Sequence, residues 1–350
     1  MTFELERIVR SNILGLKPYS SARSEFDGAA EGFLDANENS FGSPAGDGYN
    51  RYPDPLQKEL KARIAAIKQL KTSQIFVGNG SDEAIDLLFR IFCEPGNDEV
   101  IICPPTYGMY VVSAEINDVT VKEVPLTMQF GLDVESVKSA MSERTKLLFV
   151  CSPNNPTGNL MNRESIIALA GIFDGIVVVD EAYIDFAGQP SISTEIEHLP
   201  NVVVLQTFSK AWGMAGLRVG LAFASAEIVE LMNRVKPPYN VSGIAQRAVI
   251  DAMGESDTVD KWVGQILAER ERLSRKLTKF RWVKKVYPSD ANFVLVRVEN
   301  AVSAYRHLIG EKIVVRDRSA VRLCDECLRI TVGTSSENDR LIEALSRFES

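Results

Sequence analysis

Short apolar runs alternate with helix-like segments between about residues 75 and 225. Several of these runs are apolar throughout rather than at every second position, as expected for strands that helices cover on both faces. The predicted strands are 74–78, 99–103, 145–151, 175–180, 201–208 and 219–224. Helices are predicted between them, for example over 81–92 and 163–173. This alternation is typical of an α/β domain with a mostly parallel sheet.

The pattern changes after about residue 230, where a long charged helical segment (242–279) precedes further strand-like runs and a helix from Ser336. Strands and helices that are separated in this way indicate a smaller α+β domain. We therefore expect three parts. They are an N-terminal arm joining the small domain (1–36), a large α/β domain (37–240), and a long connecting helix with the small C-terminal α+β domain (241–350).

The composition narrows the class of protein. The chain has 350 residues, of which 45% are hydrophobic, and no run of about 18 apolar residues predicts a transmembrane helix. Its 39 Lys and Arg against 47 Asp and Glu give a net charge of −8. That charge argues against nonspecific nucleic-acid binding, because such binding requires a basic surface.

The cysteines and histidines indicate a cytoplasmic protein without a metal site. Five scattered cysteines suggest reduced thiols, which are typical of the cytoplasm. Cys324 and Cys327 form a C-x-x-C pair, but no second pair completes a zinc site. Only two histidines occur, so a multi-histidine metal centre is not expected either.

Polar or glycine-rich residues follow four of the predicted strands. They are Gly78–Gly80, Asn154–Pro156, Asp180 and Ser209–Lys210. Functional groups gather at the carboxyl ends of the strands in such sheets.

Each of these four positions also has an explanation that involves no function. The glycine turn could belong to a capped helix and Asn155 to a turn, while Asp180 could be a helix N-cap. Lys210 could be a solvated lysine at a strand end.

Considered together, these residues fit pyridoxal 5′-phosphate (PLP). The cofactor requires a lysine amine, which Lys210 supplies, and an acid partner for its ring nitrogen, which Asp180 supplies. Burial lowers the pKa of a lysine and makes its amine a usable nucleophile. Tyr183 and Asn155 could donate hydrogen bonds to the ring oxygen. The sequence therefore predicts a cofactor site at this edge of the sheet.

The phosphate of such a cofactor also has a predicted site. The glycine turn leads into a helix that opens at Ser81, and the first N–H groups of a helix, together with its dipole, attract an anion. Ser209 and Arg218 add a hydroxyl and a guanidinium, which are suited to the same phosphate.

Three motifs carry a family resemblance: SPNNPTG at 152–158, VVDEAYIDF at 178–186 and SKAWGMAGLRVG at 209–220. In this order and spacing they resemble the fold-type I, class II aminotransferases, which use PLP. Further motifs are similar to those of the histidinol-phosphate aminotransferases within that family. These are LKPYSSAR (16–23), LDANENS (34–40), NRYPDP (50–55), GNGSDEAID (78–86), PPTYGMY (104–110), VVRDRS (314–319) and CLRITVGT (327–334). The resemblance implies a PLP-binding large domain with a mostly parallel seven-stranded sheet, and a homodimer.

The resemblance implies a role for each matching residue of the cofactor site. Lys210 bonds the cofactor and moves the proton of the substrate Cα. Asp180 pairs with the ring nitrogen, and Asn155 and Tyr183 hold the ring oxygen, so these four residues are the expected catalytic set. The other expected cofactor contacts are Ser81, Asp82, Tyr107, Thr207, Ser209, Arg218 and, from the neighbouring subunit, Tyr52.

A substrate pocket is implied in the same way. Arg329 resembles the arginine that binds the carboxylate of glutamate, and its apolar neighbours share the opposite face of the predicted strand. An exposed arginine on an edge strand is the alternative for this residue. Arg316 and Tyr19 match positions associated with the phosphate of histidinol phosphate, and Asn37 matches a substrate-side position.

The implied reaction is a transamination between L-histidinol phosphate and 2-oxoglutarate that gives imidazole-acetol phosphate and L-glutamate, as in histidine biosynthesis. An aromatic amino-acid aminotransferase and a threonine-phosphate decarboxylase share the same fold and remain alternatives. A noncatalytic PLP-binding regulator is a candidate of another class. Such regulators usually append a DNA-binding domain, for which the motifs early in this chain leave no room.

Overall fold

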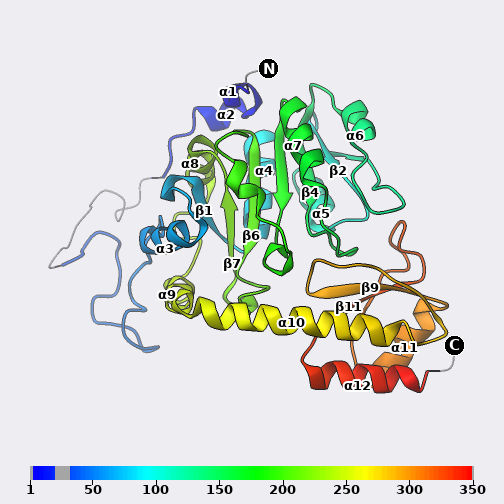
Figure 1. Ribbon diagram of the computed structural model, residues 1–350. Helices are drawn as coiled ribbons and strands as arrows, with labels where there is room; N and C mark the ends of the chain where they lie inside the picture. Colours follow the sequence, from blue (N-terminus) through cyan, green and yellow to red (C-terminus); the bar gives the residue numbers. More distant parts are fainter. Residues whose placement is uncertain (1–2, 20–31, 349–350) are drawn as a thin grey trace.

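The predicted strands of the large domain form one sheet in the computed structural model, which describes residues 3–19 and 32–348 (Figure 1). The strand order is β1-β7-β6-β5-β4-β2-β3; β7 is antiparallel to both of its neighbours, and the other pairs are parallel. The strands are β1 (Ile75–Asn79), β2 (Glu99–Ile102), β3 (Thr120–Glu123), β4 (Thr145–Cys151), β5 (Ile176–Asp180), β6 (Val202–Thr207) and β7 (Val219–Phe223). The prediction of a mostly parallel, seven-stranded sheet is confirmed.

Alternate residues of the central strands enter two separate hydrophobic cores. In β5, Val177 and Val179 join one core, whereas Ile176 and Val178 join the other. Successive side chains of a strand point to opposite faces, so a strand that is covered on both faces is apolar throughout. The first core is covered by α3 (Lys58–Lys68), α6 (Val134–Ala140), α7 (Arg163–Ile172) and α9 (Gly243–Ala252), and the second by α4 (Ser81–Phe92), α5 (Met109–Ile116) and α8 (Ala226–Val235).

The described helices of the N-terminal arm lie on the large domain, whereas we expected the arm to join the small one. They are α1 (Leu5–Ile8) and α2 (Ser11–Leu14). Their apolar residues Ile8 and Ile13 enter the core beside α4, and the Arg10 side chain bonds to the Glu94 carboxylate at 3.0 Å. Residues 20–31 of the predicted arm lie outside the described residues.

The predicted long helix over 242–279 is two helices. The first is α9, which packs on the large domain through Ala245 and Val249. A short turn at Met253–Glu255 separates it from α10 (Ser256–Leu277). Gly254 lies in that turn, where a poor helix former favours a break. The small domain therefore begins after α9, one helix later than the boundary expected at residue 240.

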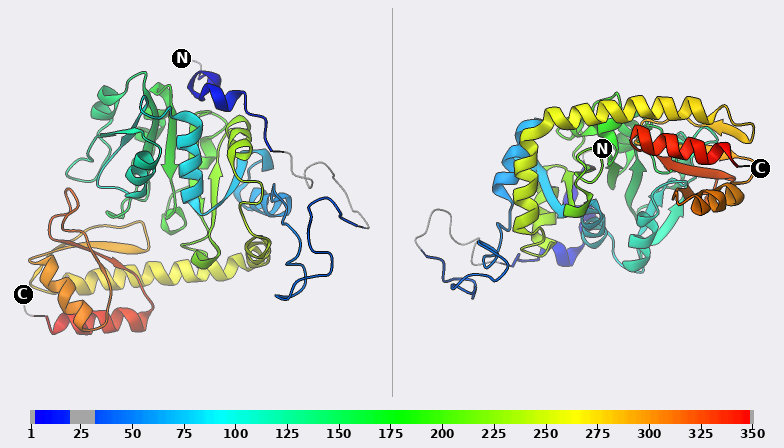
Figure 2. Two further views of the ribbon diagram at one scale, coloured as in Figure 1. Left: turned by 180° about the vertical axis from the view of Figure 1, so that it is seen from behind. Right: turned by 90° about the horizontal axis from the view of Figure 1, so that it is seen from below.

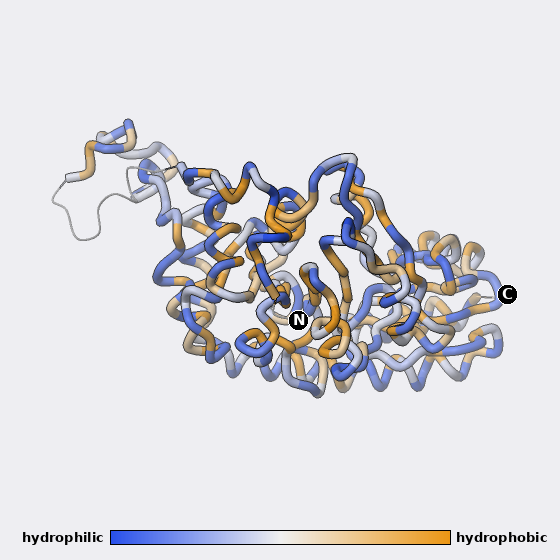
Figure 3. The backbone as a smooth tube through the Cα atoms, turned by 90° about the horizontal axis from the view of Figure 1, so that it is seen from above, coloured by the Kyte–Doolittle hydropathy of each residue, from blue (hydrophilic) through white to orange (hydrophobic). Residues whose placement is uncertain are grey.

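The small domain is a four-stranded antiparallel sheet covered by helices (Figure 2). Its strand order is β10-β11-β9-β8. Its elements are β8 (Val283–Val286), β9 (Phe293–Val298), α11 (Ala301–Gly310), β10 (Arg316–Asp317), β11 (Cys327–Thr331) and α12 (Ser335–Ser346). Figure 3 shows hydrophilic and hydrophobic residues alternating along α10, whose Leu273 and Leu277 enter the core of this domain. In the described part of the chain, no helix is long and apolar enough to cross a membrane.

Candidate active site

A cavity of about 660 Å³ lies between the carboxyl edge of the large sheet and the small domain. Every residue predicted for the site lines it except Tyr19, Asn37 and Tyr52. Parallel strands bring their ends to one edge, and β7 adds its beginning there because it runs antiparallel. Thr207 at the end of β6 pairs with Gly220 of β7. The cationic Arg218, just before β7, therefore reaches the same edge as Lys210.

Asp180 is the last residue of β5, and only 3% of its surface is exposed. Its carboxylate accepts hydrogen bonds from the Tyr110 hydroxyl at 2.7 Å and from the Ala182 N–H at 3.1 Å. Burial raises the pKa of Asp180, and these hydrogen bonds partly offset the increase. The N-cap position of the next helical turn is Tyr183 and not Asp180, so the structure disfavours the N-cap explanation for Asp180. A buried carboxylate of this kind suits a cationic ring nitrogen.

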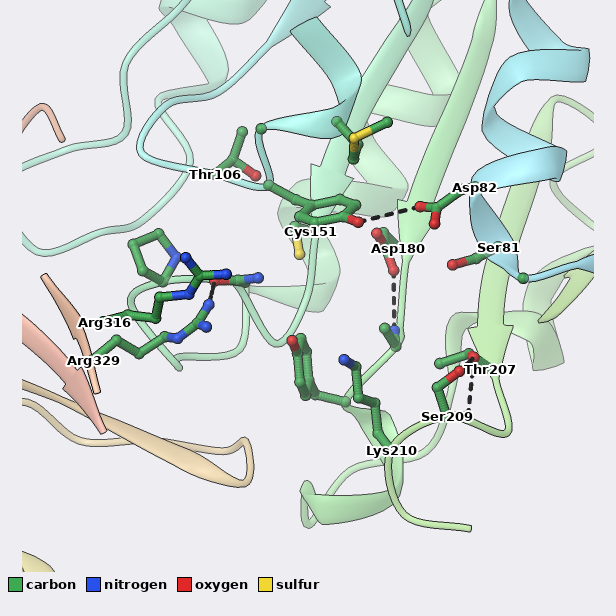
Figure 4. A pocket seen from close by; sticks show the side chains of 18 of the residues that line it. Ser81, Asp82, Thr106, Cys151, Asp180, Thr207, Ser209, Lys210, Arg316 and Arg329 are labelled. Carbon is green, nitrogen blue, oxygen red and sulfur yellow. Dashed lines mark hydrogen bonds between the residues drawn. The ribbon is translucent and has the colours of Figure 1, made fainter. Parts of the chain in front are cut away.

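Lys210 extends into the cavity from the loop after β6 (Figure 4). Its Nζ lies 5.5 Å from the centre of the Tyr183 ring. Loss of solvation, together with the positive charge of Arg329, lowers the pKa of Lys210. A lysine with a lowered pKa presents more neutral amine, which is the nucleophilic form. Burial raises the pKa of Tyr183, so its phenol keeps a proton to donate.

The beginning of α4 forms the predicted phosphate cradle. Gly80 precedes the helix with φ of 77° and contributes no capping side chain, so the first N–H groups of α4 remain available to an anion. A Cβ on Gly80 would lie 2.6 Å from Nη2 of Arg218, so the glycine allows that guanidinium to come close. This geometry favours an anion site over a capped helix.

Hydroxyl groups and an aromatic ring complete the cofactor side of the cavity. The Thr207 hydroxyl bonds to the Ser209 hydroxyl at 2.9 Å and accepts the Ser209 N–H at 3.1 Å. The Tyr107 hydroxyl donates to the Asp82 carboxylate at 3.2 Å. Arg218 reaches the same carboxylate at 3.4 Å. Asp82 therefore connects the phosphate cradle to the ring of Tyr107.

Arg329 and Arg316 approach from the small domain (Figure 4). They lie directly opposite each other on the antiparallel strands β11 and β10. Arg329 donates a hydrogen bond to the amide oxygen of Asn155, which leaves the amide nitrogen of Asn155 as a donor for a ring oxygen. Because β11 is an inner strand between β10 and β9, the structure excludes the edge-strand explanation for Arg329.

Two further residues hold the site together, and sequence reasoning assigned neither of them a role. Tyr110 is fully buried in α5 and bonds to Asp180 as described above. The buried Asn154 amide donates to the Pro105 carbonyl at 2.8 Å and accepts from the Thr106 hydroxyl at 3.1 Å. Asn154 therefore ties the loop after β4 to the loop that carries Tyr107. The repeated tyrosine in PPTYGMY was an available signal for Tyr110.

Tyr19, Asn37 and Tyr52 are exposed on the described chain, away from the residues that line the cavity. Tyr52 stacks on Tyr239 with a ring-centre distance of 4.4 Å. The motif that begins at Leu16 continues beyond Tyr19 into residues 20–23, which lie outside the described residues. In the single chain, these three residues therefore do not join the site.

The polar groups that line the cavity fit PLP. The cavity holds a lysine amine, a buried carboxylate, an uncapped helix start and a guanidinium, which match the aldehyde, ring nitrogen and phosphate of that cofactor. Cys324 and Cys327 are free, buried thiols. Within the described ranges, no three His, Cys, Asp or Glu side chains gather in a way that could hold a metal ion.

Comparisons with known proteins point to the same chemistry. The family model described as aminotransferase class I and II matches residues 27–345. A histidinol-phosphate aminotransferase from Cytophaga hutchinsonii is 51% identical over 348 residues, which cover 99% of this chain and 100% of that protein.

Two solved structures extend the likeness to the fold. The histidinol-phosphate aminotransferase from Clostridium acetobutylicum superposes with a TM-score of 0.79 at 27% identity, covering 85% of this chain and 90% of that one. The histidinol-phosphate aminotransferase from Sinorhizobium meliloti, in complex with pyridoxal-5′-phosphate, also has a TM-score of 0.79, at 25% identity, and covers 89% of this chain and 88% of that one.

Proposed function

The chain belongs to the aminotransferase class I and II family, and we propose that it exchanges the amino group between L-histidinol phosphate and 2-oxoglutarate. It is a PLP-dependent enzyme. The observation that carries the substrate assignment is the pair of opposed guanidiniums, Arg316 and Arg329, across the cavity from the cofactor groups. The products are imidazole-acetol phosphate and L-glutamate, and the biosynthetic direction is the reverse of this reaction.

Lys210 is the residue that bonds the cofactor and moves the proton. Bound PLP supplies an electron sink for the electron pair that is left when the substrate Cα loses its proton. The lowered pKa of Lys210 keeps its amine able to accept that proton and to return it to C4′ of the cofactor. Asp180 keeps the ring nitrogen protonated, and its hydrogen bond from Tyr110 fixes the orientation of the carboxylate.

Tyr183 and Asn155 hold the ring oxygen, each as a hydrogen-bond donor. Asn155 is oriented for this by Arg329, whose guanidinium donates to the amide oxygen. Arg329 also binds the carboxylate of glutamate, because a planar guanidinium pairs with a carboxylate through two parallel hydrogen bonds. A substrate carboxylate at Arg329 therefore lies next to the group that holds the ring.

We infer that the working unit is a homodimer. Eight large apolar side chains are exposed at the described positions between residues 14 and 56, and Figure 1 shows much of residues 32–56 as a loop that extends away from the body of the chain. They are Leu14, Leu16, Tyr19, Leu34, Phe41, Tyr49, Tyr52 and Leu56. Exposed apolar groups gathered in this way mark an interaction surface. In a dimer, Tyr52 reaches the cofactor phosphate of the neighbouring subunit, and Tyr19 and Asn37 take part in the substrate pocket.

The five cysteines support a cytoplasmic location. All of them are free and buried, and thiols remain reduced in the cytoplasm.

A panel of amine donors tests the proposed reaction. With 2-oxoglutarate as acceptor, we expect kcat/KM for L-histidinol phosphate to exceed that for L-phenylalanine by about 100-fold, because an unpaired guanidinium site loses much of its binding energy when the phosphate is missing. A preference for phenylalanine would identify an aromatic aminotransferase instead. Release of CO₂ from L-threonine phosphate would identify the decarboxylase.

A lysine variant tests the catalytic assignment. Lys210→Ala should abolish the absorbance of the lysine-bound cofactor and the activity with every donor, since no other group in the site supplies the amine. The exposed Lys279→Ala is the matched control and should retain both. Cofactor binding without turnover in the unaltered protein would favour the noncatalytic regulator.

A further inference from the structure

A third guanidinium, that of Arg318, lies on the substrate side of the cavity. Arg318 follows β10 and continues its ladder, because its N–H donates to the Cys327 carbonyl at 2.8 Å. Side chains two positions apart in an extended strand share a face. Arg316 and Arg318 therefore lie on one face, and both line the cavity that Arg329 enters from β11.

These guanidiniums have no carboxylate partner within the part of the chain that the structure describes. Asp317, the acidic residue between two of them, bonds instead to the Ser319 N–H at 2.8 Å. The Nε atoms of Arg318 and Arg329 are buried without a hydrogen-bond partner. Burial lowers the pKa of Arg318, and the nearby Arg316 lowers it further.

Three neighbouring guanidiniums without a carboxylate partner destabilise the folded chain unless an anion binds between them. Like charges directly opposite each other on neighbouring strands destabilise a sheet. A buried donor without a partner adds a desolvation cost. The cofactor phosphate does not relieve this cost, because its cradle is at the beginning of α4, beside Arg218.

The number of guanidiniums matches a phosphate ester better than a carboxylate. A carboxylate carries one charge and is satisfied by one bidentate guanidinium. A phosphate monoester carries a charge of about −1.5 to −2 at pH 7 and offers three acceptor oxygens. Arg329 is assigned to a carboxylate of the amino-acid substrate. Arg316 and Arg318 therefore remain for the phosphate of the amine substrate.

We propose that Arg318 is a specificity-determining residue that joins Arg316 in binding the phosphate of the amine substrate. This inference rests on the proposed function. Arg318 supplies the second positive charge, which a dianionic phosphate uses and a single carboxylate does not. It therefore favours phosphorylated amines over aromatic amino acids, which carry a single carboxylate.

The test compares Arg318→Gln with Arg322→Gln in the PLP-loaded enzyme. Arg322 is an exposed arginine in the same loop and is not among the residues that line the cavity, so its variant removes the same charge without removing the contact. Arg318→Gln should lower kcat/KM for L-histidinol phosphate by about 10- to 100-fold, the range expected for a hydrogen bond to a charged group. Arg322→Gln should change it less than twofold, and Arg318→Lys should partly restore it.

A second substrate separates phosphate binding from damage to the fold. The half-reaction with L-phenylalanine, which has one carboxylate and no phosphate, is followed by the absorbance of the cofactor in a single turnover and should change less than threefold in Arg318→Gln. Unphosphorylated L-histidinol should react equally with the unaltered enzyme and the variant. Equal losses for phenylalanine and histidinol phosphate, or an equal effect of Arg322→Gln, would overturn the assignment of Arg318.

Inhibition by phenyl phosphate makes the outcome independent of the natural substrate. This phosphate monoester has no amine, so it binds without reacting. Its inhibition constant against glutamate should rise at least tenfold in Arg318→Gln and remain unchanged in Arg322→Gln. If histidinol phosphate is not turned over but this dependence on Arg318 persists, the proposed substrate is wrong and the phosphate site stands. If phenyl phosphate inhibits both enzymes equally, the phosphate site is wrong.

Discussion

The hydrogen bond between Tyr110 and Asp180 shows how a residue that was given no role from the sequence sets the chemistry of one that was. Burial raises the pKa of Asp180, and the Tyr110 hydroxyl, at 2.7 Å, counteracts this by stabilising the ionised carboxylate. The ionised form is the one that pairs with a protonated ring nitrogen. In the proposed mechanism, Tyr110 is therefore a positioning residue, which acts on the cofactor through Asp180.

Replacing Tyr110 by Phe should shift the acid limb of the pH–rate profile. Without the donor, the pKa of Asp180 rises, so its carboxylate is protonated at a higher pH and activity begins to fall at a higher pH as the solution is acidified. We expect kcat to fall about 3- to 10-fold near neutral pH, in line with the loss of one hydrogen bond of about 1 kcal/mol. The measurement is kcat for the glutamate half-reaction between pH 5 and 9.

Tyr287→Phe is the control for this change. Tyr287 is also buried, but it packs against Phe130 with a ring-centre distance of 5.1 Å, in a core cluster of the large domain. Its variant should leave the acid limb where it is. If both variants shift the limb equally, the effect comes from altered packing and not from the hydrogen bond to Asp180.

The sequence predicts the reactive residues better than the residues that support them. Lys210 and Asp180 stand out because a charged residue directly after an apolar strand requires an explanation. Tyr110 does not stand out, because an aromatic residue in an apolar helix usually contributes to a core. Arg318 is equally inconspicuous: a charged residue in a loop is ordinary until the cross-strand pairing of Arg316 and Arg329 is known.

At the scale of elements, the phosphate cradle at the beginning of α4 depends on how closely β7 approaches that helix. Gly220 lies at the point of contact. A Cβ at this position would come within 2.1 Å of the Ser81 nitrogen and 2.2 Å of the Gly80 carbonyl carbon. Because both contacts are to backbone atoms, no side-chain rotation can relieve them. The glycine therefore holds the helix start and Arg218 at the spacing that an anion requires.

Gly220→Ala should weaken both the fold and the cofactor site. Overpacking of this kind typically costs about 1–3 kcal/mol, and we expect a loss in the free energy of unfolding of at least that size, measured by urea denaturation of the PLP-free protein. Affinity for PLP should fall as well, because α4 must move away from Arg218. Gly216→Ala, for which no atom lies within 4 Å of the new Cβ, should change neither quantity appreciably. Equal stability of the two variants would contradict this account.

The strands that the sequence predicts best are those whose two faces are both buried. The inner strands β4, β5 and β6 are buried on both faces, so their apolar runs identify them. Strand β3 was not predicted, because it lies at the sheet edge and its sequence, TVKE, mixes polar and apolar residues that are exposed or half-buried. The break between α9 and α10 was not predicted, because a single glycine such as Gly254 is tolerated within many helices and does not by itself mark an end.

At the scale of the whole molecule, the exposed apolar residues of the described N-terminal segment support the proposed homodimer. Phe41 is fully exposed, and 91% of the surface of Leu34 is exposed. Exposed side chains of this size are normally scattered, whereas here they gather in one segment with the three expected site residues that do not line the cavity. Tyr19, Asn37 and Tyr52 lie in recognisable motifs but do not line the cavity of one chain, so the roles expected for them depend on the proposed homodimer.

Mixing two inactive variants tests whether each active site uses residues of both subunits. Lys210→Ala and Tyr52→Ala should each be nearly inactive alone. In a mixed dimer, one site combines Lys210 of the second variant with Tyr52 of the first and is therefore intact. If subunits exchange at random, half of the dimers are mixed and each has one intact site of two, so activity should recover to about a quarter of that of the unaltered enzyme.

A mixture of Lys210→Ala and Asp180→Ala is the matched control, because both residues line the same cavity of one subunit. A mixed dimer of this kind contains no intact site, so activity should not recover. Exchange itself is measured by labelling one variant and following the mixed species by mass spectrometry. Recovery in both mixtures would point to contamination, and no recovery in either despite exchange would mean that Tyr52 acts within its own subunit. Recovery in the first mixture alone requires a tyrosine that crosses the interface, since only then can a chain without a working lysine repair its neighbour.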